Sequence, residues 1–142
     1  MSETNLWKWL SESVLPEGHY SRIESPDTAP GFPDVHYQIR DDISGTLELK
    51  FARRPNARVP FKNERDGLHK SQKVWIRQEL HHGGTVWIVA QVQDWIFVIP
   101  GRYAERFNGA SVRELESMSS VILNRKRTPE AARDMYHTLK EI

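Results

Sequence analysis

Apolar and polar residues alternate along two neighbouring segments in the first half of the chain, residues 34–40 and 46–52. The apolar members are Val35, Tyr37, Ile39, Leu47, Leu49 and Phe51. A period of two is typical of a strand with one buried face, and residues 41–45 between the segments are typical of a turn. The pattern therefore predicts an antiparallel hairpin.

Helical spacing of apolar residues flanks this hairpin. Residues 6–15 are predicted to form a short helix capped by Thr4 or Asn5, and a short strand is predicted over residues 20–23. A second helix is predicted over residues 68–82, ended by Gly83-Gly84. The apolar stripes of the two helices are Leu6, Trp7, Leu10 and Val14, and Leu68, Trp75, Ile76 and Leu80.

The second half of the chain is predicted to add strands and then helices. Residues 85–92 are almost continuously apolar, as in a strand covered on both faces, and a turn leads to another strand over residues 95–99. The last forty residues are predicted to be helical, with Ser111 capping one helix and Thr128 opening another. This order predicts an α/β fold, a mixed β-sheet flanked by helices.

Length and composition narrow the class of protein. The 142 residues fit a single domain, with a core at about 6–100 and a C-terminal helical extension at about 102–142. The absence of cysteine excludes disulfides, thiolate zinc sites and thiol catalysis. No apolar run is long enough for a membrane span, and no secretory signal is visible at the N-terminus. We therefore expect a cytoplasmic protein without a membrane partner.

Charge is unevenly distributed although the net charge is only +1. Residues 1–49 carry 3 Lys/Arg against 9 Asp/Glu, residues 50–77 carry 9 against 2, and residues 78–142 carry 8 of each. An acidic block followed by a basic block suggests carboxylates that hold a cation beside a surface that attracts phosphates. A mixed, solvated surface is the alternative.

The polar faces of the two predicted hairpin strands carry the candidate chemistry. Asp34, His36 and Gln38 share one face of the first strand, and Glu48 and Lys50 share one face of the second. If the apolar faces pack on one core, two carboxylates and an ammonium converge on the other side. Paired carboxylates suit Mg²⁺, and a nearby lysine can orient or deprotonate an attacking water. The alternative is an exposed strand face with a cross-strand ion pair.

Gln72 occupies a position in the stripe of the second helix where an apolar residue is expected. A buried glutamine needs hydrogen-bonding partners, which a metal-bound water or a site carboxylate could provide. A glutamine at the edge of the stripe, bonded to backbone, is the other interpretation.

Taken in order, these features resemble the PD-(D/E)XK nuclease superfamily over about residues 20–100. The features are Pro33-Asp34 at the start of one strand, Glu48-Leu49-Lys50 on the next, Gln72 and Trp75 on a helix, Gly83-Gly84, and the apolar strand 86–90. The chain is most similar to small phage and bacterial members related to the VRR-NUC and Holliday-junction-resolvase groups. The resemblance implies a restriction-endonuclease-like fold.

The resemblance also implies a role for each matching residue. Asp34, Glu48 and the Leu49 carbonyl would bind Mg²⁺, with Mn²⁺ as a substitute, Lys50 would act on the attacking water, and Gln72 would support the site. The implied activity is hydrolysis of phosphodiester bonds in DNA, with branched or junction DNA among the candidate substrates. A homodimer is a possible partner, and a symmetric dimer would favour junction cleavage, because two matched cuts need two related sites.

Many members of the superfamily carry a further glutamate on the first helix. Glu12 is predicted to face solvent, because it lies opposite the apolar stripe of that helix. Glu24 is the preferred substitute, with an ion pair between Glu24 and Arg22 as the structural alternative. His36 is expected to be a bystander.

The basic block supplies the predicted DNA contacts, which are Arg53, Arg54, Arg58, Lys62, Arg65, Lys70 and Lys73. Two other functions remain open at this point. One is a catalytically inactive DNA-binding or assembly module of the same fold, and the other is a scaffold protein in which the Glu-x-Lys sequence is accidental.

Overall fold

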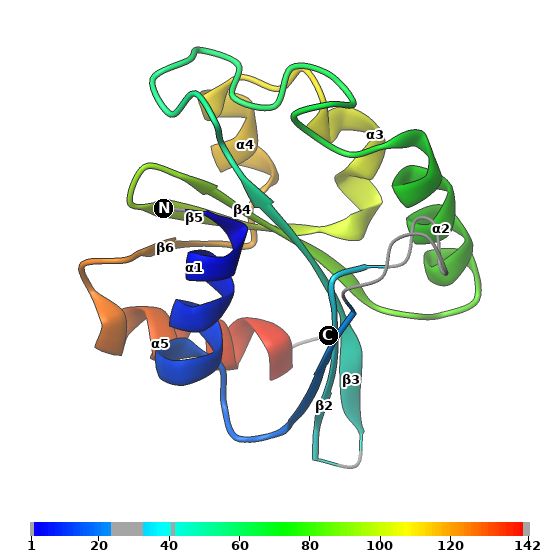
Figure 1. Ribbon diagram of the computed structural model, residues 1–142. Helices are drawn as coiled ribbons and strands as arrows, with labels where there is room; N and C mark the ends of the chain where they lie inside the picture. Colours follow the sequence, from blue (N-terminus) through cyan, green and yellow to red (C-terminus); the bar gives the residue numbers. More distant parts are fainter. Residues whose placement is uncertain (1, 24–32, 41, 141–142) are drawn as a thin grey trace.

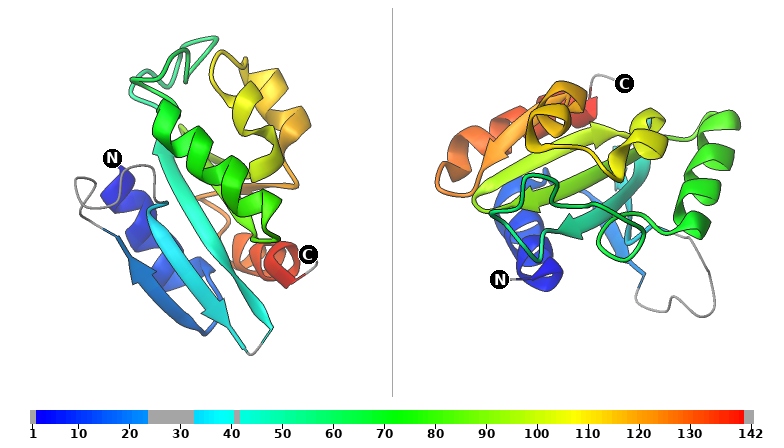
Figure 2. Two further views of the ribbon diagram at one scale, coloured as in Figure 1. Left: turned by 90° about the vertical axis from the view of Figure 1, so that its right-hand side faces the viewer. Right: turned by 90° about the horizontal axis from the view of Figure 1, so that it is seen from above.

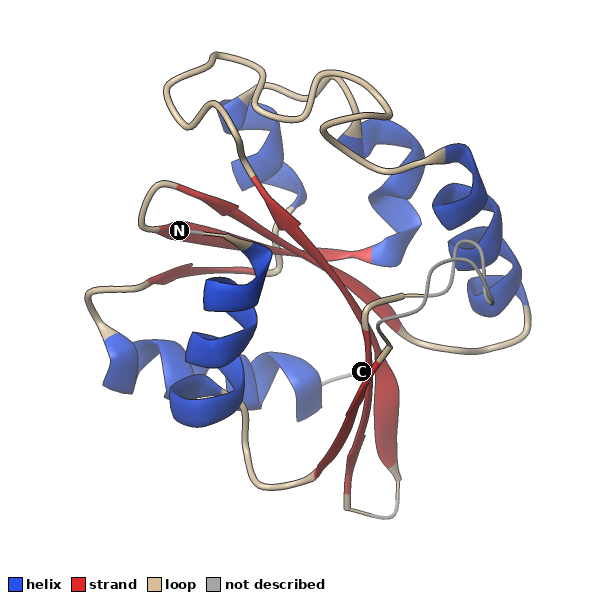
Figure 3. Ribbon diagram, viewed as in Figure 1, coloured by secondary structure: helices blue, strands red, loops and turns tan. Residues whose placement is uncertain are grey.

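The computed structural model of the protein describes residues 2–23, 33–40 and 42–140. Within these residues, six strands form one sheet in the order β1-β2-β3-β4-β5-β6 (Figure 1). Only β3 and β4 are parallel, and all other neighbours are antiparallel. Helices cover both faces of the sheet (Figure 3). The predicted α/β fold with a mixed sheet is therefore confirmed.

The predicted hairpin is present and has the predicted buried face. The strands are β1 (His19–Arg22), β2 (Val35–Ile39), β3 (Ile43–Phe51), β4 (Val86–Val92), β5 (Trp95–Pro100) and β6 (Val121–Asn124). Val35 pairs with Leu47 across the β2–β3 hairpin, and both are buried. Every residue of β4 is buried, as its continuous apolar sequence predicts.

The helices form two layers. They are α1 (Glu3–Trp9), the π-helical turn η1 (Leu10–Val14), α2 (Lys70–His81), the 3-10 turn η2 (Gly101–Tyr103), α3 (Ala104–Phe107), α4 (Val112–Met118) and α5 (Thr128–Lys140). One core cluster joins α1, η1 and α5 to the sheet, and a second joins α2, α3 and α4 to its other face. None of the described helices is long and apolar enough to cross a bilayer.

The first helix begins earlier than predicted. Its N-cap is Ser2, whose Oγ accepts a hydrogen bond from the Asn5 N–H at 3.2 Å, so neither Thr4 nor Asn5 is the cap. Glu3 therefore lies in the first turn, where a carboxylate is favoured by the helix dipole. The second helix also differs slightly, since α2 starts at Lys70 and Leu68 is buried in the loop before it.

The C-terminal third is not entirely helical, which corrects the prediction. Residues 121–124 form β6, which pairs with β5 and extends the sheet. A four-residue strand has too few positions for a visible period, and its pairing with β5 spans more than twenty residues of sequence. The predicted caps are nevertheless correct: the Ser111 Oγ accepts from the Glu114 N–H at 3.2 Å, and α5 begins at Thr128.

Candidate active site

A pocket of about 790 Å³ lies where the start of β2 and the end of β3 meet the first residues of α1 and α2. Asp34, Glu48, Lys50 and Gln72 all line it, so the four side chains singled out in the sequence come together. The other lining residues are Ser2, Glu3, Thr4, Arg22, Phe51, Arg53, Arg65, Asp66 and His69. Figure 2 shows α1 and α2 on either side of the β2–β3 pair.

Asp34 is held against the backbone of β3. Strand β2 begins at Val35, opposite Leu47, and one position beyond this pair the Asp34 Oδ2 accepts a hydrogen bond from the Leu49 N–H at 2.7 Å. The Asp34 carboxylate thus extends the hydrogen bonding between β2 and β3 by one residue before the start of β2. Because the N–H and C=O of one residue in an extended strand point to the same edge, the Leu49 carbonyl lies on the Asp34 side of β3.

Glu48 and Lys50 project from β3 toward α2 and are almost fully buried. Glu48 is 1% exposed and Lys50 is 8% exposed. The Lys50 Nζ lies 3.6 Å from the Glu48 Oε1. A buried carboxylate and ammonium are costly to remove from water unless other groups bond to them, and in this site Gln72 does so.

Gln72 contacts both charged groups. Its Nε2 donates to the Glu48 Oε1 at 2.5 Å, and its Oε1 accepts from the Lys50 Nζ at 3.2 Å. The same Oε1 accepts from the His69 N–H at 2.8 Å. Gln72 is the third residue of α2, so reaching back to the free N–H of the cap residue fixes the direction of its amide. Gln72 thus combines both sequence-based interpretations: it is half-buried and bonds a backbone N–H, and it also bonds the Glu48 carboxylate and the Lys50 ammonium.

The carboxylates of the pocket hold their protons more tightly than free carboxyl groups. Burial raises the pKa of Glu48 well above its ordinary value, and the neighbouring Asp34 and Glu3 charges raise it further. Burial also raises the pKa of Asp34, against the opposing effects of the Leu49 N–H and Lys50. Because the ionised forms of Asp34 and Glu48 are disfavoured in the pocket, a cation bound between them would be stabilised.

Glu3 and Asp66 are pocket carboxylates that sequence reasoning missed, and Glu3 is the one that interacts electrostatically with Asp34 and Lys50. Much of the Glu3 surface is exposed, yet partial burial and the nearby Asp34 charge raise its pKa, while Lys50 and Arg22 lower it. Placing the helix cap at Thr4 or Asn5 put Glu3 outside the predicted helix. The sequence Ser2-Glu3 could have indicated the true start of the helix, because serine is a favoured N-cap residue and an acidic residue is favoured in the first turn.

The other residues considered for the site lie elsewhere. Glu12 is exposed, as predicted, and His36 is exposed and does not line the pocket. Glu24, the preferred additional carboxylate, lies outside the described residues, so that prediction stays open. Arg22, which was considered only as a partner for Glu24, lines the pocket itself.

The basic block is a well-anchored surface beside the pocket. The buried Phe61 ring lies 4.9 Å from the Phe107 ring, and the Phe61 carbonyl accepts from the Gly109 N–H at 2.9 Å. Asn108 also bonds both backbone groups of Leu68, at 2.8 and 2.9 Å. The exposed cations are Arg53, Arg54, Arg58, Lys62, Arg65 and Lys70, with Lys73 half-buried. Of these, Arg53 and Arg65 line the pocket.

The donor set fits a hard divalent cation. Asp34 and Glu48 offer carboxylate oxygens, and the Leu49 carbonyl lies on the Asp34 side of the same strand. Mg²⁺ takes one or two carboxylates and completes its shell with water and phosphate oxygens. No group of three or more His, Asp or Glu side chains arranged to hold a metal occurs among the residues that the structure describes. A cation here would therefore depend on two carboxylates, backbone, water and substrate.

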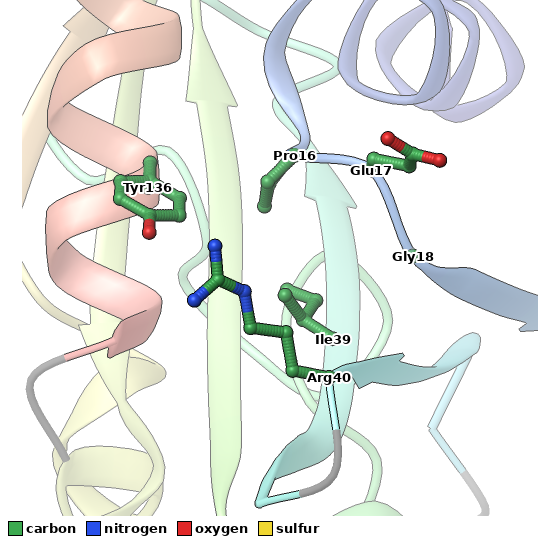
Figure 4. Close-up of a pocket in the computed structure, with 6 residues that line it drawn as sticks. All are labelled: Pro16, Glu17, Gly18, Ile39, Arg40 and Tyr136. Atoms are coloured by element: carbon green, nitrogen blue, oxygen red, sulfur yellow. The ribbon is translucent and has the colours of Figure 1, made fainter.

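A second pocket of about 420 Å³ offers less chemistry. Its lining residues are Pro16, Glu17, Gly18, Ile39, Arg40 and Tyr136 (Figure 4). The Arg40 guanidinium extends into it between Tyr136 and Pro16, and Glu17 lies on the far side of Pro16 from Tyr136. With one exposed carboxylate and no lysine or histidine in its lining, this pocket lacks the convergence of charged groups seen around Glu48.

Neither a protein-family model nor a curated protein matches this sequence. Function is therefore inferred from the geometry and chemistry of the pocket around Glu48.

Proposed function

We propose that the protein is a metal-dependent DNA nuclease that hydrolyses phosphodiester bonds. The observation that carries the proposal is the bonded set of Glu48, Lys50 and Gln72 beside the Asp34 carboxylate in one pocket. Two carboxylates that a bound cation would stabilise, next to a buried ammonium, suit a cation-assisted reaction on a phosphate. Resemblance to the PD-(D/E)XK superfamily points to the same reaction.

Asp34, Glu48 and the Leu49 carbonyl are the groups that would hold Mg²⁺. When bound, Mg²⁺ lowers the pKa of a coordinated water and acts as a Lewis acid toward a phosphoryl oxygen. Asp34 is already fixed for this role, because its hydrogen bond to the Leu49 N–H immobilises one of its two oxygens. Glu48 is fixed by Gln72 in the same way.

Lys50 would act on the attacking water and on the developing charge of the phosphate. Its ammonium shares the pocket with both carboxylates and is oriented by the Gln72 Oε1. A positive charge held in place before the reaction stabilises a developing anion with little reorganisation. Arg53 and Arg65, at the pocket wall, would bind the flanking phosphates.

Incubation of the purified protein with a panel of labelled DNAs tests the proposal. The panel contains single strands, blunt duplexes, flaps, and three-way and four-way junctions, each with Mg²⁺, Mn²⁺ or EDTA. We expect cleavage in Mg²⁺ or Mn²⁺ that EDTA abolishes and that Glu48→Gln and Asp34→Ala each remove. Glu12→Gln is the matched control, since Glu12 is an exposed carboxylate outside the pocket.

The competing function is a DNA-binding or assembly module of the same fold that does not cleave. Salt-sensitive DNA binding without cleavage of any panel member in either metal would favour that module. Absence of both binding and cleavage would favour a scaffold protein in which the Glu-x-Lys sequence has no catalytic meaning.

A further inference from the structure

The sheet ends in an open edge at β6. In the strand order, β6 has β5 on one side and no strand of the described chain on the other (Figure 1). The helix that packs against β6 is α5, which lies on one face of the sheet rather than along its edge. An uncovered edge is a template for pairing with another strand.

The register of β6 defines which backbone groups face outward. The Arg125 N–H donates to the Asp94 carbonyl at 2.9 Å, just beyond the Trp95–Asn124 pair. Residues of an antiparallel strand alternate between facing their partner and facing away. Ile122 therefore presents its N–H and C=O groups to the outer edge, whereas the Asn124 carbonyl accepts from the Arg127 N–H at 3.0 Å.

The exposed apolar side chains of the described chain gather at this same edge. Trp95 is 47% exposed and Ile122 is 38% exposed, and they are the two large hydrophobic residues classed as exposed among the residues described. Ile122 pairs with Phe97, so Ile122 and Trp95 lie on one face of the sheet as diagonal neighbours. Two isolated exposed hydrophobics need no explanation, but two that are diagonal neighbours beside an open edge indicate an interface.

A groove of about 260 Å³ runs along this edge between Trp95, Ile122 and the first turns of α5. The charged residues in its lining are two cations and two carboxylates, Arg127, Arg133, Glu130 and Asp134. The Arg133 Nε lies 3.3 Å from the Asp134 Oδ1. A balanced lining does not attract a polyanion such as DNA, and its lack of net charge adds no net repulsion when an identical surface approaches.

We propose that β6 pairs with the β6 strand of a second copy of this chain, antiparallel and about a two-fold axis at Ile122. Directly opposite residues in an antiparallel pair share a face of the sheet, so this register places Ile122 against itself beside both Trp95 rings. It also places Val121 opposite Leu123 on the core face. The outward N–H and C=O of Ile122 then bond reciprocally across the axis. The two sheets join into one, with the pockets around Glu48 on the outer halves.

Light scattering after size exclusion, at protein concentrations from about 1 to 500 μM, tests the proposal. We expect a concentration-dependent dimer in the wild type, because an edge of four residues gives a weak contact. Ile122→Lys places a charge from each copy at the axis and should raise the dissociation constant at least about tenfold. Thermal unfolding of the same sample shows whether this exposed position has disturbed the fold.

The matched control is His19→Lys, which introduces the same residue at an exposed position of β1, the strand at the opposite edge. This variant should dimerise like the wild type. A wild type that stays monomeric to about 500 μM overturns the proposal and leaves the edge to a strand of a different protein. A dimer that survives Ile122→Lys, or that His19→Lys breaks instead, overturns it as well.

Amide hydrogen exchange of the wild type gives a second test that needs no variant. The outward N–H of Ile122 should be protected at high protein concentration and exchange rapidly at low concentration, whereas the Leu123 N–H, which faces β5, should be protected at both. Equal and rapid exchange of Ile122 at all concentrations contradicts the proposal. These measurements report assembly alone, so they are independent of whether the protein cleaves DNA.

Discussion

The Gln72 side chain joins Glu48 to its neighbour Lys50, donating to the Glu48 Oε1 at 2.5 Å and accepting from the Lys50 Nζ at 3.2 Å. An amide is suited to this position because it offers a donor to the carboxylate and an acceptor to the ammonium at once. The His69 N–H, which also bonds the Gln72 Oε1, prevents the amide from turning over. The pair on β3 is thereby locked to the first turn of α2.

Lys50→Ala should reduce cleavage by about 10²–10³-fold if, as proposed, its ammonium stabilises the charge that develops on the phosphate. Gln72→Ala should cost less, about 10–100-fold, because it loosens groups that remain present. Single-turnover cleavage rates measure both. Gln78→Ala, an exposed glutamine on the same helix, should cleave at the wild-type rate. Equal losses in Lys50→Ala and Gln78→Ala would contradict the assignment.

Glu48→Gln should stabilise the metal-free protein at pH 8 and leave it little changed near pH 4. The folded-state pKa of Glu48 lies above its value in the unfolded chain, so the folded state binds the extra proton, and stability declines as the pH rises between the two values. Each pKa unit of difference corresponds to about 1.4 kcal/mol. Urea unfolding in EDTA from pH 4 to 8 measures the effect.

The same variant reports on the metal. Mg²⁺ should raise the free energy of unfolding of the wild type, because it binds the folded state, and should raise that of Glu48→Gln much less. Glu12→Gln should behave like the wild type throughout. A Glu48→Gln protein that is strongly destabilised at pH 8 would show that Glu48 is a structural ion-pair partner.

Glu3→Gln should increase the Mg²⁺ concentration needed for half-maximal cleavage, by about several-fold to tenfold. Glu3 adds negative charge to the pocket but, unlike Asp34 and Glu48, is not a predicted metal ligand, so its loss weakens the attraction for a cation without removing a ligand. Titration of cleavage with Mg²⁺ measures the change, and Glu12→Gln on the same helical segment is the control. An identical titration for both variants would mean that Glu3 lies too far from the cation to act on it.

Removal of three cations from the basic block should flatten the salt dependence of DNA binding. If Arg53, Arg58 and Lys62 each contact one phosphate, replacing all three with Ala lowers the slope of log affinity against log salt by about 2–3. Fluorescence anisotropy with a labelled duplex measures the slope. The control replaces Arg127, Arg133 and Lys140, three exposed cations at or on α5, on the other face of the sheet. If this control flattens the slope instead, DNA binds that face.

Gly45→Ala should destabilise the fold by about 1–3 kcal/mol. A Cβ at this position would lie 2.5 Å from the Tyr37 hydroxyl oxygen and 2.9 Å from the Thr85 carbonyl oxygen, both closer than packing permits. Tyr37 is fully buried and cannot withdraw easily. Chemical denaturation measures the loss, and Ser44→Ala, at the exposed neighbouring position, should change stability by less than about 0.5 kcal/mol.

The alternation of Val35, Tyr37 and Ile39, matched by Leu47 and Leu49, was enough to predict the hairpin and its buried face. That single inference also put Asp34, Glu48 and Lys50 on the opposite side, because side chains in a strand alternate with a fixed period. Helical spacing also placed Gln72 in the apolar stripe of its helix, in line with Ile76, but its role beside Glu48 and Lys50 was implied only by the family resemblance. These placements depend only on the local periods of strands and helices, so the sequence by itself determined them.

Only the tertiary structure decided which remote segments complete the site and the sheet. Glu3 reaches the pocket because α1 packs across the sheet, and Arg22 does so because β1 pairs with β2, and neither contact has a sequence period. The short β6 is a strand because β5 offers it a free edge, more than twenty residues away in the chain. Pairing between distant segments depends on the fold that brings them together, so spacing along the chain carries no signal for it.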